Sequence, residues 1–342
     1  MPIADRHDRG HRLSPPAAIG SPHQRPSALT AGGHRISPHG HAPRVGLLVY
    51  MVARVLYFVP GDRERLDCVR AAQPSLEHPD ERFMLDAPTP AYKPHRTLTA
   101  DPNVNEVLSG LADYDGRRAR LYFKPLSGVR RTAAHLYGHD NPVDVGIHEV
   151  AAWWLARELG PPWSELVAPT VWFDPPDAQD IGSCGPVILG MGGYASLPQP
   201  GVGFDRLISD AAFFDAVIGA QDRHDHNLRA EMPPRLALID HGYAFARTGD
   251  WHNPYEAAGL FLKMRFGERH FPVPDGPVLD YSGVGPLSPA LGAHEQAAIA
   301  RLAADRDLLG VAQLLSDDRA QALRDRVARM AGSGEVLHAA DF

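Results

Sequence analysis

The sequence has few cysteines. It contains two in 342 residues, Cys68 and Cys184, which are far apart and form no Cys-x-x-Cys pattern. A disulfide framework and a cysteine-based zinc site are therefore disfavoured. This cysteine usage is typical of proteins in a reducing compartment, and we expect a cytoplasmic protein.

The chain also lacks an excess of basic residues and a long hydrophobic run. Its 34 Lys and Arg against 41 Asp and Glu give a formal net charge of −7. Binding to nucleic acid by counterion release needs clustered cations, so we expect no nucleic-acid partner. The best apolar run, 45–59, is interrupted by Arg54. A membrane-spanning helix needs about 20 apolar residues, so we expect no membrane span and interpret this run as an edge strand.

The composition that remains is that of a globular protein, with 44% hydrophobic and 22% charged residues. The length predicts about two domains, or one domain with two lobes and tails. We expect a disordered Pro- and His-rich tail at 1–44, with a metal-binding tail as the alternative. An edge strand and linker would follow at 45–94, an N-lobe at 95–190 and a C-lobe at 191–342.

The folded part mixes strands and helices, which predicts an α+β fold. Two apolar runs joined at Asp115-Gly116 indicate a β-hairpin that ends at Lys124. The helical spacing of apolar residues predicts helices at 143–159 and 204–220, the first stopped by Gly160. The other expected elements are strands at 167–173, 186–189 and 235–239 and a helical region from about residue 289.

The most informative motif is Asp222-Arg223-His224-Asp225-His226-Asn227, followed by Ile239-Asp240-His241-Gly242. An Asp, an Asn and a second Asp at this spacing form a phosphoryl-transfer layout. Asp222 would orient the attacking hydroxyl, and Asn227 and Asp240 would offer the hard oxygen ligands that Mg²⁺ prefers. The simpler interpretation is that these are helix-capping residues on polar loops.

Two upstream residues fit the same chemistry. Lys124 follows an apolar strand, where its ammonium can contact ATP phosphates if a carboxylate fixes it. Glu149 lies between Ile147 and Val150 on the next predicted helix, so the packed face of that helix would carry it inward. Taken singly, each is more simply a surface residue.

A rival chemistry uses the histidines of the motif. His224, His226, Asp240 and His241 could bind zinc or a pair of metals, as in metallo-hydrolases. The full His-x-His-x-Asp-His arrangement is lacking, since Asn227-Leu228 follows His226. A serine hydrolase has no Gly-x-Ser-x-Gly motif from which to start.

The Asp-Arg-His-x-x-Asn element, with Ile-Asp-His-Gly after it, resembles the catalytic and metal-binding loops of phosphatidylinositol 3- and 4-kinases and their bacterial relatives. Phe123-Lys124-Pro125-Leu126, His148-Glu149-Val150-Ala151-Ala152 and Pro169-Thr170 are similar to actinobacterial kinase-like proteins of that superfamily. HipA-type kinases resemble the chain more distantly. The resemblance covers residues 95–270.

The resemblance implies a two-lobed protein-kinase-like fold, with a small antiparallel-sheet N-lobe and a mostly helical C-lobe. ATP and Mg²⁺ would bind between the lobes, with Lys124 positioning phosphates and Glu149 holding Lys124. Val187, Leu189 and Ile239 complete the residues predicted to contact the nucleotide. The reaction would be phosphoryl transfer to an unidentified hydroxyl-bearing acceptor, which can be a protein, a lipid or a small molecule.

The chain departs from the lipid kinases in two places. His241 replaces the Phe usual after the metal-binding Asp, and no Gly-rich phosphate loop is evident beyond Ser109-Gly110 and Asp115-Gly116. A non-catalytic nucleotide-binding switch, an AMP-transferring protein and a His/Asp metallo-hydrolase therefore stay as alternatives.

Overall fold

The computed structural model divides the chain into two units, residues 1–45 and 46–342, and every described residue lies in the second. The predicted tail at 1–44 is therefore outside the described residues, as is most of the apolar run at 45–59. The structure describes residues 59, 61–73, 77–94, 105–129, 138–139, 141–178, 180–191, 203–220, 222–231, 235–247, 259–271 and 279–338.

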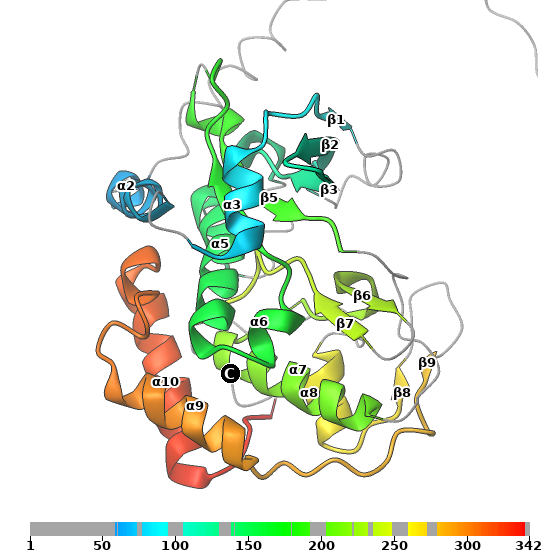
Figure 1. Ribbon diagram of the computed structural model, residues 1–342. Helices are drawn as coiled ribbons and strands as arrows, with labels where there is room; N and C mark the ends of the chain where they lie inside the picture. The colour runs from blue at the N-terminus through cyan, green and yellow to red at the C-terminus, as the bar shows by residue number, and fades with distance from the viewer. Residues whose placement is uncertain are drawn as a thin grey trace, which may run out of the picture. The chain divides into compact units, whose positions relative to one another are not determined.

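The described part is a mixed α/β structure built on a five-stranded antiparallel sheet (Figure 1). The strand order is β1-β2-β3-β5-β4. The strands are β1 Lys93–Pro94, β2 Leu108–Tyr114, β3 Arg117–Phe123, β4 Thr170–Phe173 and β5 Gly185–Leu189.

The predicted hairpin is confirmed as β2–β3, with Tyr114 opposite Arg117 across a two-residue turn. Asp115 and Gly116 both have positive φ, 49° and 72°. Two left-handed residues define the type I′ turn, whose twist matches that of the paired strands. Asp tolerates this conformation and Gly adopts it without steric cost, which is why Asp-Gly marks the turn.

Helix α5, Pro142–Leu159, lies in the chain between β3 and β4 and contacts β4 and β5. The side chain of Asn141 caps it by accepting a hydrogen bond from the Val143 N–H, and Gly160 ends it with a φ of 78°. The prediction of a helix at 143–159 is confirmed. The sequence indicated one apolar face, but almost all of the helix is buried, including the polar residues Asp144, His148 and Glu149.

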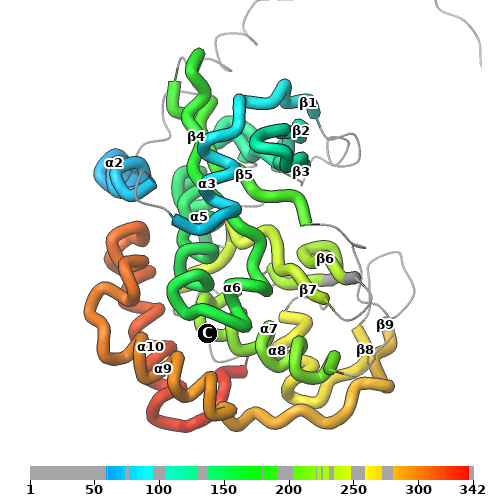
Figure 2. Tube along the Cα trace, in the orientation of Figure 1, coloured from blue at the N-terminus to red at the C-terminus, as the bar shows by residue number. Residues whose placement is uncertain are grey.

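The described part contains seven further α-helices and two small sheets (Figures 1 and 2). The helices are α2 Asp62–Ala72, α3 Pro79–Asp86, α6 Trp163–Leu166, α7 Phe204–Ile218, α8 Leu260–Arg265, α9 Ala293–Ala304 and α10 Asp317–Ser333. The small sheets are the pairs β6 Leu228–Glu231 with β7 Arg235–Leu238, and β8 His270–Phe271 with β9 Leu279–Asp280.

Helices α2 and α3 occupy a stretch that the sequence analysis expected to be a linker. That prediction is wrong for 62–72 and 79–86, because both helices bury apolar side chains in the main core. Leu66 and Val69 of α2 and Phe83 and Met84 of α3 belong to this core. Each helix is short and supplies only a few apolar residues, so its sequence carried a weak periodic signal.

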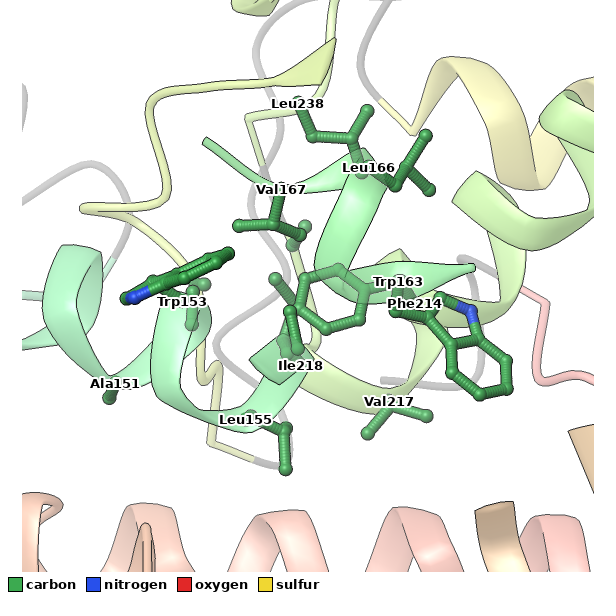
Figure 3. Close-up of a cluster of buried hydrophobic side chains, with 14 of the residues drawn as sticks. Ala151, Trp153, Leu155, Trp163, Leu166, Val167, Phe214, Val217, Ile218 and Leu238 are labelled. Carbon is green, nitrogen blue, oxygen red and sulfur yellow. The ribbon is translucent and has the colours of Figure 1, made fainter. Parts of the chain in front are cut away.

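The core joins the helices to the segment that leads into the Asp240 motif. Leu238, the last residue of β7, lies beside Leu166 at the edge of a buried cluster to which α5, α6 and α7 also contribute side chains (Figure 3). The backbone N–H of Ala168 donates to the Leu238 carbonyl over 3.0 Å. The end of β7, and with it Asp240, is therefore fixed against the helices. Among the described residues, no helix combines the length and apolar character needed to cross a membrane.

Candidate functional site

The β6–β7 hairpin brings the two motif loops together. Leu228 and Leu238 pair across the hairpin, so the residues just outside this pair, Asn227 and Ile239, face each other. The Ile239 N–H donates to the Asn227 carbonyl over 3.2 Å. The predicted metal-binding residues, Asn227 and Asp240, are thus held at the same end of one hairpin.

Lys124 bonds to two carboxylates at this point. Its Nζ lies 2.5 Å from Glu149 Oε1 and 2.8 Å from Asp240 Oδ1. The other oxygen of Glu149 accepts a hydrogen bond from the backbone N–H of His241 over 2.8 Å. The structure therefore brings Lys124, Glu149 and Asp240 together from the end of β3, from α5 and from the loop after β7.

Burial and charge shift the pKa values of these three groups in different directions. Burial alone would lower the pKa of Lys124, but the carboxylates of Asp240 and Glu149 outweigh it and raise that pKa. Burial raises the pKa of Glu149, and the Lys124 ammonium only partly opposes it. For Asp240 the burial effect is overcome by Lys124 and, to a smaller extent, by His224, so its pKa is lowered. Asp240 is therefore ionised at neutral pH, as a metal ligand must be.

The loop around Asp240 has little room for adjustment. Asp240 has a φ of 60° in the left-handed region, which Asp tolerates better than most residues. A Cβ added to Gly242 would lie 2.7 Å from Val145 Cγ1. The loop thus passes directly against α5, which explains why glycine follows His241. The Asp240 side chain is 36% exposed, so part of it is accessible from solvent.

Asp222 and Asn227 form the second half of the site. The Asn227 side-chain amide nitrogen donates to the Asp222 carbonyl over 2.7 Å, so the amide oxygen is the atom that the predicted metal site would use. The Asp222 side chain is 15% exposed, and its Oδ1 lies 3.8 Å from His224 Nε2. Asp222, Asn227 and Asp240 therefore occupy adjoining loops, as the sequence analysis predicts.

Two predicted nucleotide contacts lie on the wrong face of the sheet. Val187 pairs with Phe123, and Leu189 pairs with Leu121. Side chains alternate between faces along a strand, so these residues lie on the opposite face from Lys124. Both are buried in the main core. The structure therefore places Val187 and Leu189 in the core and not on the face of the sheet that carries Lys124, where the sequence analysis expected them.

Tyr122 and Ile188, which pair with each other, are two residues of this sheet on the Lys124 face. Tyr122 stands two positions before Lys124, and Ile188 is the β5 residue between the two that were predicted. The sequence of an uninterrupted apolar strand does not show which residues point to which face of the sheet. Only the pairing register shows that Ile188 lies on the face of Lys124. Ile239, the third predicted contact, is half-buried next to Asp240.

The geometry does not favour the rival metallo-hydrolase. His241 is buried, and its Nδ1 lies 3.1 Å from an Arg223 nitrogen that can only donate, so Nδ1 accepts. His224 uses its own Nδ1 to accept from the His226 backbone N–H. Among the described residues, the groups of three or more side chains that could hold a metal include none of His224, His226 and His241.

A buried cluster that the sequence analysis missed consists of His139, Asp144 and His148. Their ligand atoms lie within 4.8 Å of one another, as in a metal site. However, Arg65 donates to Asp144 over 2.6 Å and Arg319 lies 3.7 Å from its other oxygen. Two guanidinium groups beside one carboxylate oppose a divalent cation there. A second such group consists of Asp210, His294 and Glu295. Its Glu295 carboxylate is already ion-paired with Arg265, which likewise opposes a divalent cation.

A small cavity lies on the α5 side of Lys124, and its volume is about 10 Å³. Residues lining it include Glu106, Leu126, Val145 and Gly146. This space is close to that of one water molecule, whereas ligand pockets enclose about 300 Å³ or more. This cavity is therefore too small to hold a nucleotide.

The buried Lys124–Glu149 ion pair leads to a prediction about the free energy of unfolding. Lys124→Met leaves the Glu149 carboxylate buried without its cation, and we expect a loss of about 3 kcal/mol in the free energy of unfolding. Adding Glu149→Gln removes the uncompensated charge and keeps an acceptor for the His241 N–H. The double variant should therefore be more stable than Lys124→Met alone. Urea unfolding of both variants at neutral pH measures this, and a double variant that is no more stable would contradict the ion-pair interpretation.

Compared with models of protein families and with curated protein sequences, the chain matches neither a family model nor a curated sequence.

Proposed function

We propose that the protein is an ATP- and Mg²⁺-dependent phosphotransferase of the kinase-like type, acting on a hydroxyl-bearing acceptor. The observation that carries the proposal is the pair of bonds from Lys124 to Glu149 and to Asp240. In protein kinases a lysine of the third strand pairs with a glutamate of the following helix, beside a metal-binding aspartate. Lys124 directly follows the third strand here, and Glu149 lies on the next long helix.

The arrangement of elements supports a two-lobed kinase-like interpretation. The five-stranded sheet and α5 would form the small lobe, and α7 to α10 with the β6–β7 hairpin would form the larger one. Lys124 and Glu149 would then belong to the small lobe, and Asp222, Asn227 and Asp240 to the larger. Nucleotide phosphates would bind where these two sets of residues meet.

The donor set fits Mg²⁺ and ATP. Asn227 and Asp240 would hold the metal through an amide oxygen and an ionised carboxylate, which are hard ligands suited to Mg²⁺. The metal would neutralise charge on the nucleotide phosphates. Lys124 would exchange part of its bond to Asp240 for a contact with phosphate oxygens, and Glu149 would keep it in place. Tyr122, Ile188 and Ile239 are the candidates for apolar contacts.

Asp222 would orient the acceptor hydroxyl and accept its proton. Its carboxylate lies on the loop that also carries Asn227, and the chain that delivers it leaves the buried helix α7. A transferred phosphoryl group needs positioning and charge neutralisation more than covalent help. The proposed roles account for the donor side of the reaction, and the proposal describes the acceptor only as a hydroxyl.

ATP binding that depends on Mg²⁺ is the direct test. With Mg²⁺ and ATP at about 100 times the dissociation constant, we expect the folded state to gain about 2.7 kcal/mol. Thermal unfolding with ATP and MgCl₂, and with ATP and EDTA, measures this gain. In Asp240→Asn the gain should vanish, because the metal loses its charged ligand.

The matched control is Asp115→Asn, because Asp115 also has a positive φ and lies in the β2–β3 turn. It should keep the full effect of Mg²⁺ and ATP. Equal stabilisation of Asp240→Asn and the wild type would count against the proposed metal site. Transfer of label from γ-labelled but not α-labelled ATP separates phosphoryl transfer from AMP transfer. Stoichiometric zinc lost on His224→Ala would instead support a hydrolase.

A further inference from the structure

Arg223, inside the first motif, is buried beneath both metal-binding loops. Its side chain is 1% exposed, and its guanidinium faces the Asp215 carboxylate of α7. The Nε of Arg223 lies 3.2 Å and 3.1 Å from the two oxygens of that carboxylate. The sequence analysis assigned no role to this residue, because the sequence alone does not show whether an arginine is buried or faces solvent.

The same guanidinium binds the backbone of both loops. One terminal nitrogen donates to the Asn227 carbonyl over 2.5 Å and to the Ile239 carbonyl over 2.8 Å. These carbonyls belong to one proposed metal ligand, Asn227, and to the residue before the other, Asp240. The second terminal nitrogen donates to His241 Nδ1 over 3.1 Å. Arg223 therefore contacts the chain at Asn227 and on both sides of Asp240.

The hydrogen bonds of Arg223 are linked to Lys124 through His241 and Glu149. The His241 backbone N–H donates to Glu149, which in turn holds Lys124. A chain of buried polar contacts thus leads from Asp215 through Arg223, His241 and Glu149 to the lysine. The link from Arg223 to the segment after Asp240 depends on His241, whose Nδ1 supplies the acceptor.

Geometry makes arginine the suitable residue here. Its planar guanidinium presents five N–H donors in a fixed fork, so the groups it binds are held at set separations. Mg²⁺ requires near-octahedral ligands at about 2.0–2.1 Å and tolerates small errors in their placement poorly. A rigid fork that binds both loops would meet this requirement. A lysine would supply the charge without the fork.

We propose that Arg223 is a positioning residue that sets the separation of Asn227 and Asp240, and so the affinity of the site for Mg²⁺. This inference rests on the proposed function, because it takes Asn227 and Asp240 as the metal ligands. Arg223 itself touches neither the metal nor the nucleotide.

The chain contains a matched control in Arg265. Its side chain is also 1% exposed, and it pairs with Glu295 over 2.7 Å and 2.9 Å. It donates to the carbonyls of Ser209, Ser288 and Ala290. The two arginines thus have the same kind of surroundings, and those of Arg265 include no residue of the proposed site. Arg223→Lys and Arg265→Lys should cost similar stability.

The experiment titrates MgCl₂ into protein with a fixed ATP concentration and measures ATP binding by calorimetry. In Arg223→Lys we expect the Mg²⁺ concentration for half-maximal binding to rise at least about tenfold, as for residues that orient metal ligands. Arg265→Lys should match the wild type. Hydrogen exchange without ligand should be faster in segments 222–231 and 235–247 of Arg223→Lys, and unchanged there in Arg265→Lys.

The outcomes separate this inference from the proposed function. Wild-type protein that does not bind ATP with Mg²⁺ would overturn the proposed function and the metal-positioning role together. Wild-type protein that binds normally, with the same Mg²⁺ requirement in Arg223→Lys, would overturn the inference alone. The exchange comparison needs no nucleotide, so equal exchange of the two segments in both variants would also count against Arg223 as their common support.

Discussion

Asp222→Asn is expected to reduce phosphoryl transfer about 10²–10⁴-fold, the usual contribution of a positioned acid or base. Binding of ATP with Mg²⁺ should change little. The reason is that Asp222 lies beside the proposed metal ligands and is not proposed as one of them, and Asn227 contacts it mainly through the Asp222 backbone carbonyl. That contact survives the substitution. The effect should therefore fall on the reaction rather than on binding.

The measurement is ADP release from ATP and MgCl₂ with water as the acceptor, together with calorimetric ATP binding. Asp174→Asn is the control, because Asp174 is ion-paired with Arg70 and belongs to no proposed site. It should keep both the rate and the affinity. Asp222→Asn with turnover close to that of the wild type would rule out Asp222 as the residue that orients the acceptor. Loss of ATP binding in this variant would assign Asp222 to the metal site instead.

The second large effect is a loss of stability in acid, from His139 and His148. Both are fully buried, and their rings lie 4.9 Å apart. Burial lowers both pKa values well below the ordinary value. Arg319 lowers both further, and Arg65 also lowers that of His148. Asp144 and the backbone of Gly242 and Tyr243 oppose the shifts without reversing them.

The sign follows from proton binding. In the unfolded chain these histidines take up protons as the pH falls through about 6.5, while in the folded protein they stay neutral. Stability is therefore complete above that pH and decreases below it, toward the lowered folded pKa. Each histidine should cost about 1.4 kcal/mol between pH 7.5 and pH 5.5, and the pair about 3 kcal/mol.

Urea unfolding across this pH range tests the prediction. The double variant His139→Gln/His148→Gln cannot be protonated, so it should lose about 3 kcal/mol less than the wild type over the same interval. His270→Gln is the control, because His270 is exposed on β8, and it should retain the wild-type pH dependence. An unchanged pH dependence in the double variant would show that other groups cause the acid sensitivity.

The local sequence was sufficient for several elements and for the types of residue that meet at the site. Asp115-Gly116 specifies a turn with two left-handed residues, and the hairpin is where the sequence predicts it. The Ile147 and Val150 spacing predicts a helix that turns Glu149 inward, and Glu149 is 1% exposed. Lys124, Glu149 and Asp240 were identified by residue type and order, and these properties survive in any fold that brings their segments together.

Other features depend on contacts between segments far apart in the chain. Ile188 rather than Val187 shares a face with Lys124 because of the register between β3 and β5, which no single strand encodes. Arg223 contacts both loops because the β6–β7 hairpin brings them side by side. His139 and His148 meet under the backbone that follows Asp240.

The physical reason is the distance along the chain over which each kind of interaction acts. Turn type, helix capping and apolar periodicity act over a few residues, so the sequence by itself determined the β2–β3 hairpin, α5 and the residue types of the site. Strand register and the burial of charge depend on which distant surfaces pack together. Only the tertiary structure decided that Lys124 meets both carboxylates, that Ile188 shares its face, and that Arg223 supports both loops.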